Sequence, residues 1–159
     1  MKKIGCDDGS TNVKLAWRDG DEICTSVSPN SFKAGWKVAG IGSSETYNYE
    51  IDGLKYSFDS VSQQAISTTN IEYQYGDTNL LAVHHALLTC GLPPQPVSLT
   101  VTLPISEFYT SDCQHNEFNI QRKIDNLLRP VALNKRETVN NAHVDVMPES
   151  LPAGISTLE

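Results

Sequence analysis

Hydrophobic residues occupy every second position over residues 12–18, and the residues between them are small, polar or charged. This period of two is typical of a β-strand with one buried and one exposed face. Segments at 2–6 and 22–27 flank it and predict two more strands. Asp19-Gly20, before the third segment, is a frequent sequence in tight hairpin turns. The chain therefore begins with a predicted antiparallel meander of three strands.

The second half of the chain predicts helices that alternate with strands. The helical segments carry apolar residues at spacings of three and four, whereas the strand segments alternate. Asp77 stands where the first helix would have its N-terminal cap, and Gly91 suits a left-handed helix end. The predicted order is helix 77–89, strand 97–103, helix 117–128, strand 142–146 and a helix start at Pro148-Glu149-Ser150. Together with the meander, this order predicts an α/β fold around a mixed sheet.

The intervening residues 28–76 lack helical periodicity and are rich in Asn, Ser, Gly, Thr and Tyr. Two strands are predicted at 47–51 and 55–58, on either side of a hairpin turn. We expect a small strand-rich insertion in a core formed by residues 1–27 and 77–159. Either a protein contact surface or a plain solvated subdomain fits its polar and aromatic character.

Composition narrows the class of protein. The chain has 159 residues, 39% hydrophobic and 19% charged, which suits one folded domain. No apolar run is long enough for a membrane span, so no membrane partner is expected. The four cysteines are widely spaced, which favours free thiols in a reducing cytoplasm over two secreted disulfides. The net charge of −7, without a block of cations, argues against direct DNA binding.

The first predicted turn has the composition of a phosphate-binding hairpin. Gly9 permits backbone angles that other residues avoid, so that successive N–H groups can converge on an anion. Asp7 can orient a water molecule on Mg²⁺, which usually keeps several waters. An ordinary turn of the same composition is the alternative, because these residues dominate turns for local reasons. The residues that could bind the β- and γ-phosphates are Asp8, Gly9, Ser10, Thr11, Asn12 and Lys14.

This turn belongs to a longer pattern, Asp-Asp-Gly-Ser-Thr-Asn-Val-Lys-Leu at 7–15. With it, the chain resembles the N-terminal domain of the ParM/StbA plasmid-segregation proteins, which are actin-like ATPases. The resemblance covers nearly the whole chain and is weakest over 40–46 and 128–142. The other matching segments are Ser-Pro-Asn-Ser-Phe-Lys at 28–33, Tyr-Ser-Phe-Asp at 56–59, Thr-Thr-Asn-Ile at 68–71, Ala-Val-His-His-Ala-Leu-Leu-Thr at 82–89, Thr-Leu-Pro at 102–104 and Val-Met-Pro-Glu-Ser at 146–150.

The resemblance implies an actin-like ATPase fold with a ribonuclease-H-like core, in which ATP lies between two similar domains. It implies that this chain is the N-terminal half, because no second Asp-x-Gly-x-Thr pattern follows the first. It also implies that Glu149 holds the position of the catalytic glutamate; from the residues alone, capping of the helix start is an alternative role. ATP with Mg²⁺ is the expected cofactor, with GTP as the alternative nucleotide. Alone, this chain is expected to be inactive.

The resemblance further implies filaments that segregate plasmids through a DNA-bound adaptor of the ParR type. An amphipathic helix of the adaptor would enter an apolar groove, a common mode of recognition. We expect Phe108 and Tyr109 to be exposed there, because they lie in a connection. The alternatives are a half-domain of a small-metabolite kinase from the same superfamily and a non-catalytic module that binds filaments.

Overall fold

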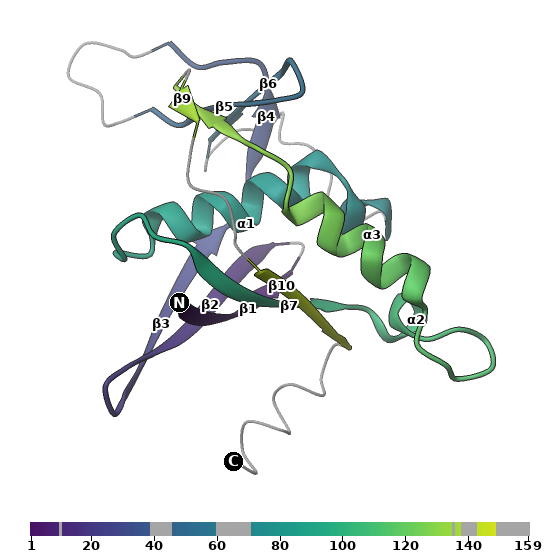
Figure 1. The fold of residues 1–159 in the computed structure, drawn as a ribbon. Coiled ribbons are helices and arrows are strands. Elements are labelled where there is room, and N and C mark those ends of the chain that lie inside the picture. Colours follow the sequence, from purple (N-terminus) through teal and green to yellow (C-terminus); the bar gives the residue numbers. More distant parts are fainter. Residues whose placement is uncertain (10, 39–45, 60–70, 135, 138–142, 149–159) are drawn as a thin grey trace.

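The computed structural model of this chain contains two β-sheets joined by helices (Figure 1). The larger sheet carries the predicted meander, and the smaller sheet lies on the far side of the helices from it. The structure describes residues 1–9, 11–38, 46–59, 71–134, 136–137 and 143–148.

The first sheet is mixed, as predicted. Its strands lie in the order β10, β7, β1, β2, β3. The meander of β1, β2 and β3 is antiparallel, while β7 is parallel to β1 and β10 is parallel to β7. β7 has the predicted bounds, whereas β1, β2, β3 and β10 extend beyond the predicted ends, because ladder pairing continues into the flanking residues. Their bounds are Lys2–Asp8 for β1, Asn12–Asp19 for β2, Glu22–Pro29 for β3, Val97–Leu103 for β7 and His143–Pro148 for β10.

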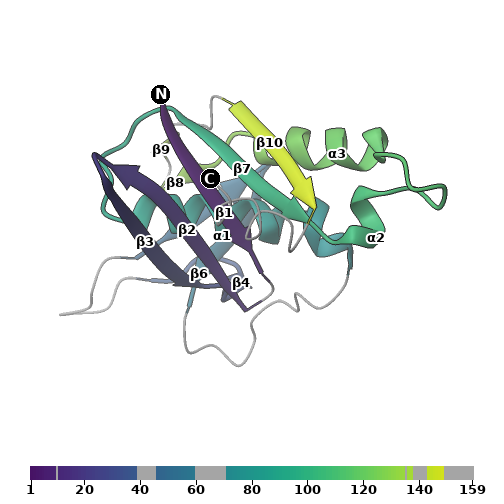
Figure 2. The same cartoon turned by 90° about the horizontal axis from the view of Figure 1, so that it is seen from below.

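Two helices cover one face of this sheet (Figure 2). They are α1 (Asp77–Thr89) and α3 (Glu117–Leu127), both close to the predicted bounds. Gly91, just beyond α1, has a φ of +96°, which confirms the left-handed residue expected there. Two shorter elements were not predicted, since a single turn carries too few residues to show a period. They are a 3-10 helix, η1 (Ile71–Tyr75), and α2 (Ile105–Phe108).

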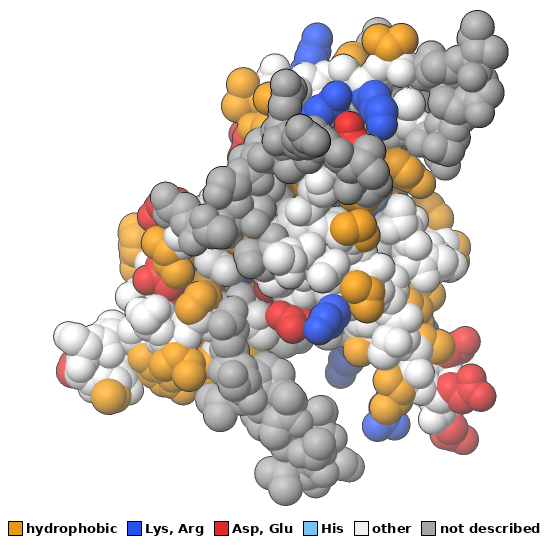
Figure 3. Space-filling model, turned by 180° about the vertical axis from the view of Figure 1, so that it is seen from behind, with side chains coloured by type: hydrophobic (Ala, Val, Ile, Leu, Met, Phe, Trp, Pro, Cys, Tyr) orange, Lys and Arg blue, Asp and Glu red, His pale blue; other side chains and the backbone are white. Residues whose placement is uncertain are grey.

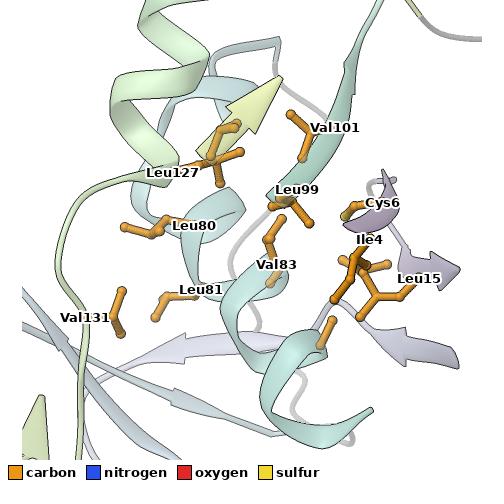
Figure 4. Packing of buried hydrophobic residues seen from close by; sticks show 14 of the residues in the cluster. Ile4, Cys6, Leu15, Leu80, Leu81, Val83, Leu99, Val101, Leu127 and Val131 are labelled. Carbon is orange, nitrogen blue, oxygen red and sulfur yellow. The ribbon is translucent and has the colours of Figure 1, made fainter. Parts of the chain in front are cut away.

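The core lies between α1, α3 and the covered face of the sheet (Figure 4). Alternate residues of β1, β2 and β7 point into it, whereas β3 leaves the side chains of Ile23 and Val27 69% and 63% exposed. The labelled side chains from the strands are Ile4, Cys6, Leu15, Leu99 and Val101, and those from α1, α3 and the following segment are Leu80, Leu81, Val83, Leu127 and Val131.

The second sheet has the strand order β4, β6, β5, β8, β9. The predicted strands of the insertion are present, and the two short strands β8 and β9 come from the chain after α3. Sequence reasoning missed β4, β8 and β9, because strands of two or three residues are too short to show a period. The bounds are Phe32–Ala34 for β4, Asn48–Ile51 for β5, Leu54–Phe58 for β6, Ala132–Leu133 for β8 and Arg136–Glu137 for β9.

Helix α1 joins the two sheets through buried aromatic and histidine side chains. The Tyr49 hydroxyl lies 2.6 Å from His85 Nδ1, and the Phe58 ring stacks on the same imidazole at 4.1 Å between centroids. Burial lowers the pKa of His84 to about 4, and burial with the neighbouring His84 lowers the pKa of His85 to about 4. Both histidines are therefore neutral packing residues at neutral pH.

Asp77 has a different role from the one predicted. The N-cap of α1 is Gly76, and no side chain caps it. The Asp77 carboxylate instead accepts hydrogen bonds from Arg129 Nη2 at 2.8 Å and from the Tyr56 hydroxyl at 2.5 Å. A cation from the end of α3 is a stronger partner than a free backbone N–H, because both groups are charged. Asp77 thus links α1 to α3 and to the second sheet.

Candidate nucleotide-binding site

The turn between β1 and β2 lies at the edge of the first sheet where three parallel strands end. The last residues of β1, β7 and β10 are Asp8, Leu103 and Pro148, and Pro148 pairs with Leu103 (Figure 2). Thr102 is close to Asp8, since its backbone N and hydroxyl lie 3.5 and 3.4 Å from that carboxylate. Ligands of open α/β sheets bind outside this carboxyl edge. The predicted phosphate turn therefore stands where a ligand site is expected.

Asp7 and Lys14 lie opposite each other on the β1–β2 hairpin. Both are exposed, and both face away from the helices, because their neighbours Cys6, Asp8 and Val13 point into the core. Directly paired side chains of an antiparallel ladder are close enough to interact. One face of the hairpin thus offers a carboxylate for a hydrated cation and an ammonium for an anion.

The turn itself is tight. A Cβ atom on Gly9 would lie 3.0 Å from the Asn12 carbonyl oxygen, closer than most Cβ contacts allow. Thr11 and Asn12 are exposed and can present hydroxyl and amide donors. Ser10 lies outside the described residues. Glycine at position 9 therefore avoids a close contact between a side chain and the backbone of Asn12.

Asn30 and Tyr73 brace the turn from the side. The Asn30 backbone N–H donates to the Thr11 carbonyl at 2.9 Å, and its side-chain amide donates to the Gly9 carbonyl at 3.2 Å. The Tyr73 hydroxyl lies 3.4 Å from the same Gly9 oxygen. Burial, and then the nearby Asp8 carboxylate, raise the pKa of Tyr73, so its hydroxyl stays a neutral donor. The turn is held by residues distant in sequence.

Asp8 points in the opposite direction from Asp7. It is 3% exposed, and its carboxylate accepts hydrogen bonds from Lys123 Nζ at 2.5 Å and from Asn79 Nδ2 at 2.7 Å. With the Thr102 contacts, both oxygens have partners inside the protein. Asp8 can therefore serve a phosphate site through its backbone and its position, while its carboxylate is engaged in the core.

Lys123 is the partner of Asp8, and sequence reasoning missed it. Its side chain is fully buried on α3, and its three donor positions face Asp8, Gln74 Oε1 at 2.9 Å and Asn79 Oδ1 at 3.0 Å. A buried ion pair of this kind is costly to break, about 3–5 kcal/mol, because the remaining charge has no partner. The signal was present: Lys123 stands three residues after Ile120 and four before Leu127, on the apolar stripe of the helix.

Other predicted sites have different outcomes. Glu149 lies outside the described residues and directly follows the last residue of β10. Phe108 was expected to be exposed, and this is wrong: it is 4% exposed, because α2 turns its ring into a small cluster with Tyr75 and Leu103. Tyr109 is partly exposed and borders a hollow of about 570 Å³, with Ile105, Ser106, Thr110, Ser111 and Cys113.

The described residues show neither a direct metal site nor a membrane-spanning helix. They contain no group of three or more His, Cys, Asp or Glu side chains that could hold a metal ion directly. A cation at Asp7 would therefore keep most of its water ligands. Within the same residues, no helix is both long and apolar enough to cross a membrane.

The mixed sheet carries the β1–β2 turn at its carboxyl edge and is joined through helices to a small second sheet. This arrangement defines a domain of the actin-like class. The chain belongs to the family described as plasmid segregation protein ParM, N-terminal, whose model matches residues 2–159. The resemblance found in the sequence is thereby confirmed. No curated protein matches the chain in sequence.

Solved structures show the same fold. The filament structure of AlfA from B. subtilis plasmid pLS32 is 14% identical, with a TM-score of 0.72 over 96% of this chain and 58% of that one. The archaeal actin homologue Ta0583 is also 14% identical, with a TM-score of 0.65 over 99% of this chain and 48% of that one. Bacillus thuringiensis ParM in apo form is 11% identical, with a TM-score of 0.63 over 99% and 48%. The chain thus spans about half the length of these structures.

Proposed function

We propose that this chain is the N-terminal half of an actin-like ATPase that forms filaments and drives plasmid segregation. The observation that carries the proposal is the exposed Asp7–Lys14 pair beside a braced glycine turn, in a chain whose family match runs over residues 2–159. Phosphoryl transfer asks a protein mainly for positioning and charge stabilisation. An exposed carboxylate and ammonium at a fixed turn supply both.

The proposed nucleotide is ATP with Mg²⁺. An AlfA filament has been solved with AMPPNP, and the archaeal actin homologue Ta0583 as a complex with ADP, so adenine nucleotides are favoured over GTP. Asp7 would orient water on Mg²⁺, which would neutralise phosphate charge. Lys14 would approach the phosphates as a point charge. The backbone and side-chain donors around them would come from Asp8, Gly9, Ser10, Thr11 and Asn12.

Glu149 is the proposed catalytic residue, which would orient the water that attacks the γ-phosphate. The parallel run of β10 beside β7 supports this role, because the chain leaves Pro148 at the same sheet edge as the phosphate turn. A carboxylate that accepts a proton from the attacking water is a typical general base.

The proposed partners are further copies of the protein, in filaments, and a DNA-bound adaptor of the ParR type. AlfA, a structural neighbour, is itself solved as a filament. The hollow beside Tyr109 is the proposed adaptor groove, with the exposed side chain of Ile105 at its wall. Phe108 supports this groove from behind, since it packs against Tyr109 at 4.9 Å between ring centroids.

The experiment is ATP binding and filament sedimentation by the full-length protein, with Asp7→Ala and Lys14→Ala variants. Both should weaken Mg²⁺-dependent ATP affinity by about tenfold or more, because each removes a charge aimed at the ligand. Lys3→Ala is the matched control, since Lys3 is exposed on the same face of β1. Unchanged ATP affinity in the Asp7 and Lys14 variants, or no ATP binding by the parent protein, would contradict the proposed function.

A further inference from the structure

The buried cation behind the phosphate turn is not used by the proposed ATPase mechanism. Lys123 lies on α3, far along the chain from the turn, and its ammonium reaches Asp8, the last residue before the turn. At 0% exposure it cannot touch a nucleotide bound outside the sheet edge. Its role must therefore be exerted through the residues that it holds.

The contacts of Lys123 form a closed network. Asn79 accepts from Lys123 at 3.0 Å and donates to Asp8 at 2.7 Å, so the three side chains complete a triangle of hydrogen bonds. Gln74 accepts the remaining ammonium proton at 2.9 Å. All donors of the ammonium are used, which is the condition for a buried polar network to hold one arrangement.

This network joins three elements to the end of β1. Asp8 ends β1, Gln74 belongs to η1, Asn79 to α1 and Lys123 to α3. Apolar side chains could fill the same space, but apolar packing is not directional and would allow the end of β1 to shift slightly. Hydrogen bonds to a charge fix both distance and angle. The arrangement thus favours precise placement of Asp8.

The two sides of the turn are held in different ways. On the outside, Asn30 binds the Gly9 and Thr11 carbonyl oxygens. On the inside, Asp8 is fixed by the Lys123 network, immediately before Gly9. Asp7, which precedes Asp8 on the strand, takes its direction from the same backbone. A shift of Asp8 would therefore move both the turn and the Asp7 carboxylate.

We propose that Lys123 is a positioning residue for the phosphate site: it holds Asp8 and thereby sets the geometry of the β1–β2 turn and of Asp7. The inference rests on the proposed ATPase function for its ligand, and on the contacts alone for its effect on the turn. It assigns to Asp8 the part of an anchor inside the core.

The test compares Lys123→Met with the double variant Asp8→Asn/Lys123→Met in the full-length protein. The single variant leaves a buried carboxylate without its cation, so loss of stability is expected. The double variant removes both charges together and should recover stability, since no buried charge stays unpaired. Arg122→Met is the matched control, because Arg122 is the preceding residue of α3 and pairs with the exposed Glu72 at the surface.

Two readouts are needed in the double variant. Hydrogen exchange at the β1–β2 turn, followed by mass spectrometry, should be faster than in the parent by about tenfold or more at equal global stability. The Kd for ATP with Mg²⁺ should rise by about tenfold or more, with Arg122→Met at the parental value in both measurements. A purely structural pair would recover both readouts together with stability.

The outcomes separate this inference from the proposed function. Parental turn exchange in the stable double variant would overturn the role of Lys123, whatever the protein binds. Loss of the fold in both Lys123 variants, with Arg122→Met folded, would also overturn it and make the pair part of the core alone. If the parent does not bind ATP, the proposed function fails, while the exchange measurement still decides whether Lys123 positions the turn.

Discussion

Two neighbouring aspartates have opposite environments in this chain. Asp7 is exposed beside Lys14, whereas Asp8 is buried beside Lys123. The cause is the strand itself, because successive side chains point to opposite faces of a sheet. The same motif therefore supplies one exposed carboxylate and one buried carboxylate, although both look equivalent in the sequence.

At Glu149, a residue-scale test separates catalysis from helix capping. Glu149→Ala in the full-length protein should leave ATP binding intact and slow hydrolysis by roughly 10²–10⁴-fold, the usual contribution of a positioned general base. Filaments should form and persist longer. Steady-state phosphate release and sedimentation measure the two effects. Asp145→Ala, exposed on β10, is the control. Hydrolysis at the parental rate in a folded Glu149→Ala protein would leave only the capping role.

The buried histidines predict how stability depends on pH. His84 and His85 have a folded-state pKa of about 4, below the ordinary value of 6.5. Between these values the unfolded chain binds more protons, so the stability of the fold is complete above pH 6.5 and declines as pH falls toward 4. Each buried imidazole can contribute up to about 3 kcal/mol to this decline.

Urea unfolding between pH 7.5 and 4.5 checks this expectation. The midpoint should move to lower urea as the solution is acidified. His143→Ala should keep the same dependence, because His143 is exposed at the surface and is not part of the buried histidine pair. A midpoint that stays constant over this range would show that the histidines are protonated without cost.

At the scale of elements, α2 and α3 bury some of their large apolar side chains and expose others. The ring of Phe108 faces the core, while Ile105 is 55% exposed at the hollow and Phe118, at the start of α3, is 76% exposed. Tyr109 follows α2 with an extended backbone and is partly exposed beside the hollow. The expected adaptor contact therefore shifts from Phe108 to Ile105 and Tyr109.

The adaptor prediction follows from this division. Ile105→Ser/Tyr109→Ser should weaken adaptor binding by about tenfold or more in the full-length protein, since aromatic and aliphatic anchors in a groove dominate such interfaces. Phe118→Ser removes an exposed ring outside the hollow and should have little effect. Fluorescence anisotropy with a labelled helix of the adaptor measures both. Equal affinity of the double variant and the parent would exclude the hollow as the binding groove. Phe108→Ser is unsuitable, because it would leave a cavity in the core.

At the scale of the whole molecule, negative charge dominates. The net charge is −7, and acidic side chains lie beside some of the Lys and Arg side chains on the face shown in Figure 3. The Nζ atoms of Lys33 and Lys37 both lie 3.8 Å from Asp59 Oδ2. DNA affinity depends on cations that replace the counterions of phosphates, and paired cations contribute little. The charge pattern therefore supports indirect attachment to a plasmid.

Direct DNA binding is accordingly expected to be weak. The chain should bind a plasmid fragment with a Kd above about 10⁻⁶ M at physiological salt, the range of non-specific association. Addition of the adaptor should recruit the full-length protein to the same fragment. Anisotropy of labelled DNA across a salt series measures both. Nanomolar, salt-sensitive binding without an adaptor would contradict the indirect attachment.

The sequence alone determined the order and type of the long elements, the place of the first turn and the family. These features are local: a period of two or of three and four, or a turn such as Asp19-Gly20, depends only on residues a few positions apart. The mixed sheet followed because a meander and alternating helices and strands have few compatible arrangements.

Tertiary structure decided the features that depend on distant contacts. Lys123 and Asp8 are 115 positions apart, and only the packing of α3 against the end of β1 makes one the partner of the other. Register placed Lys14 beside Asp7, and the path after α3 added β8 and β9 to the second sheet. The environments of Lys123 and Phe108 could not be predicted from their positions in the sequence. Burial depends on the neighbours that surround a residue, and these neighbours are set by the fold.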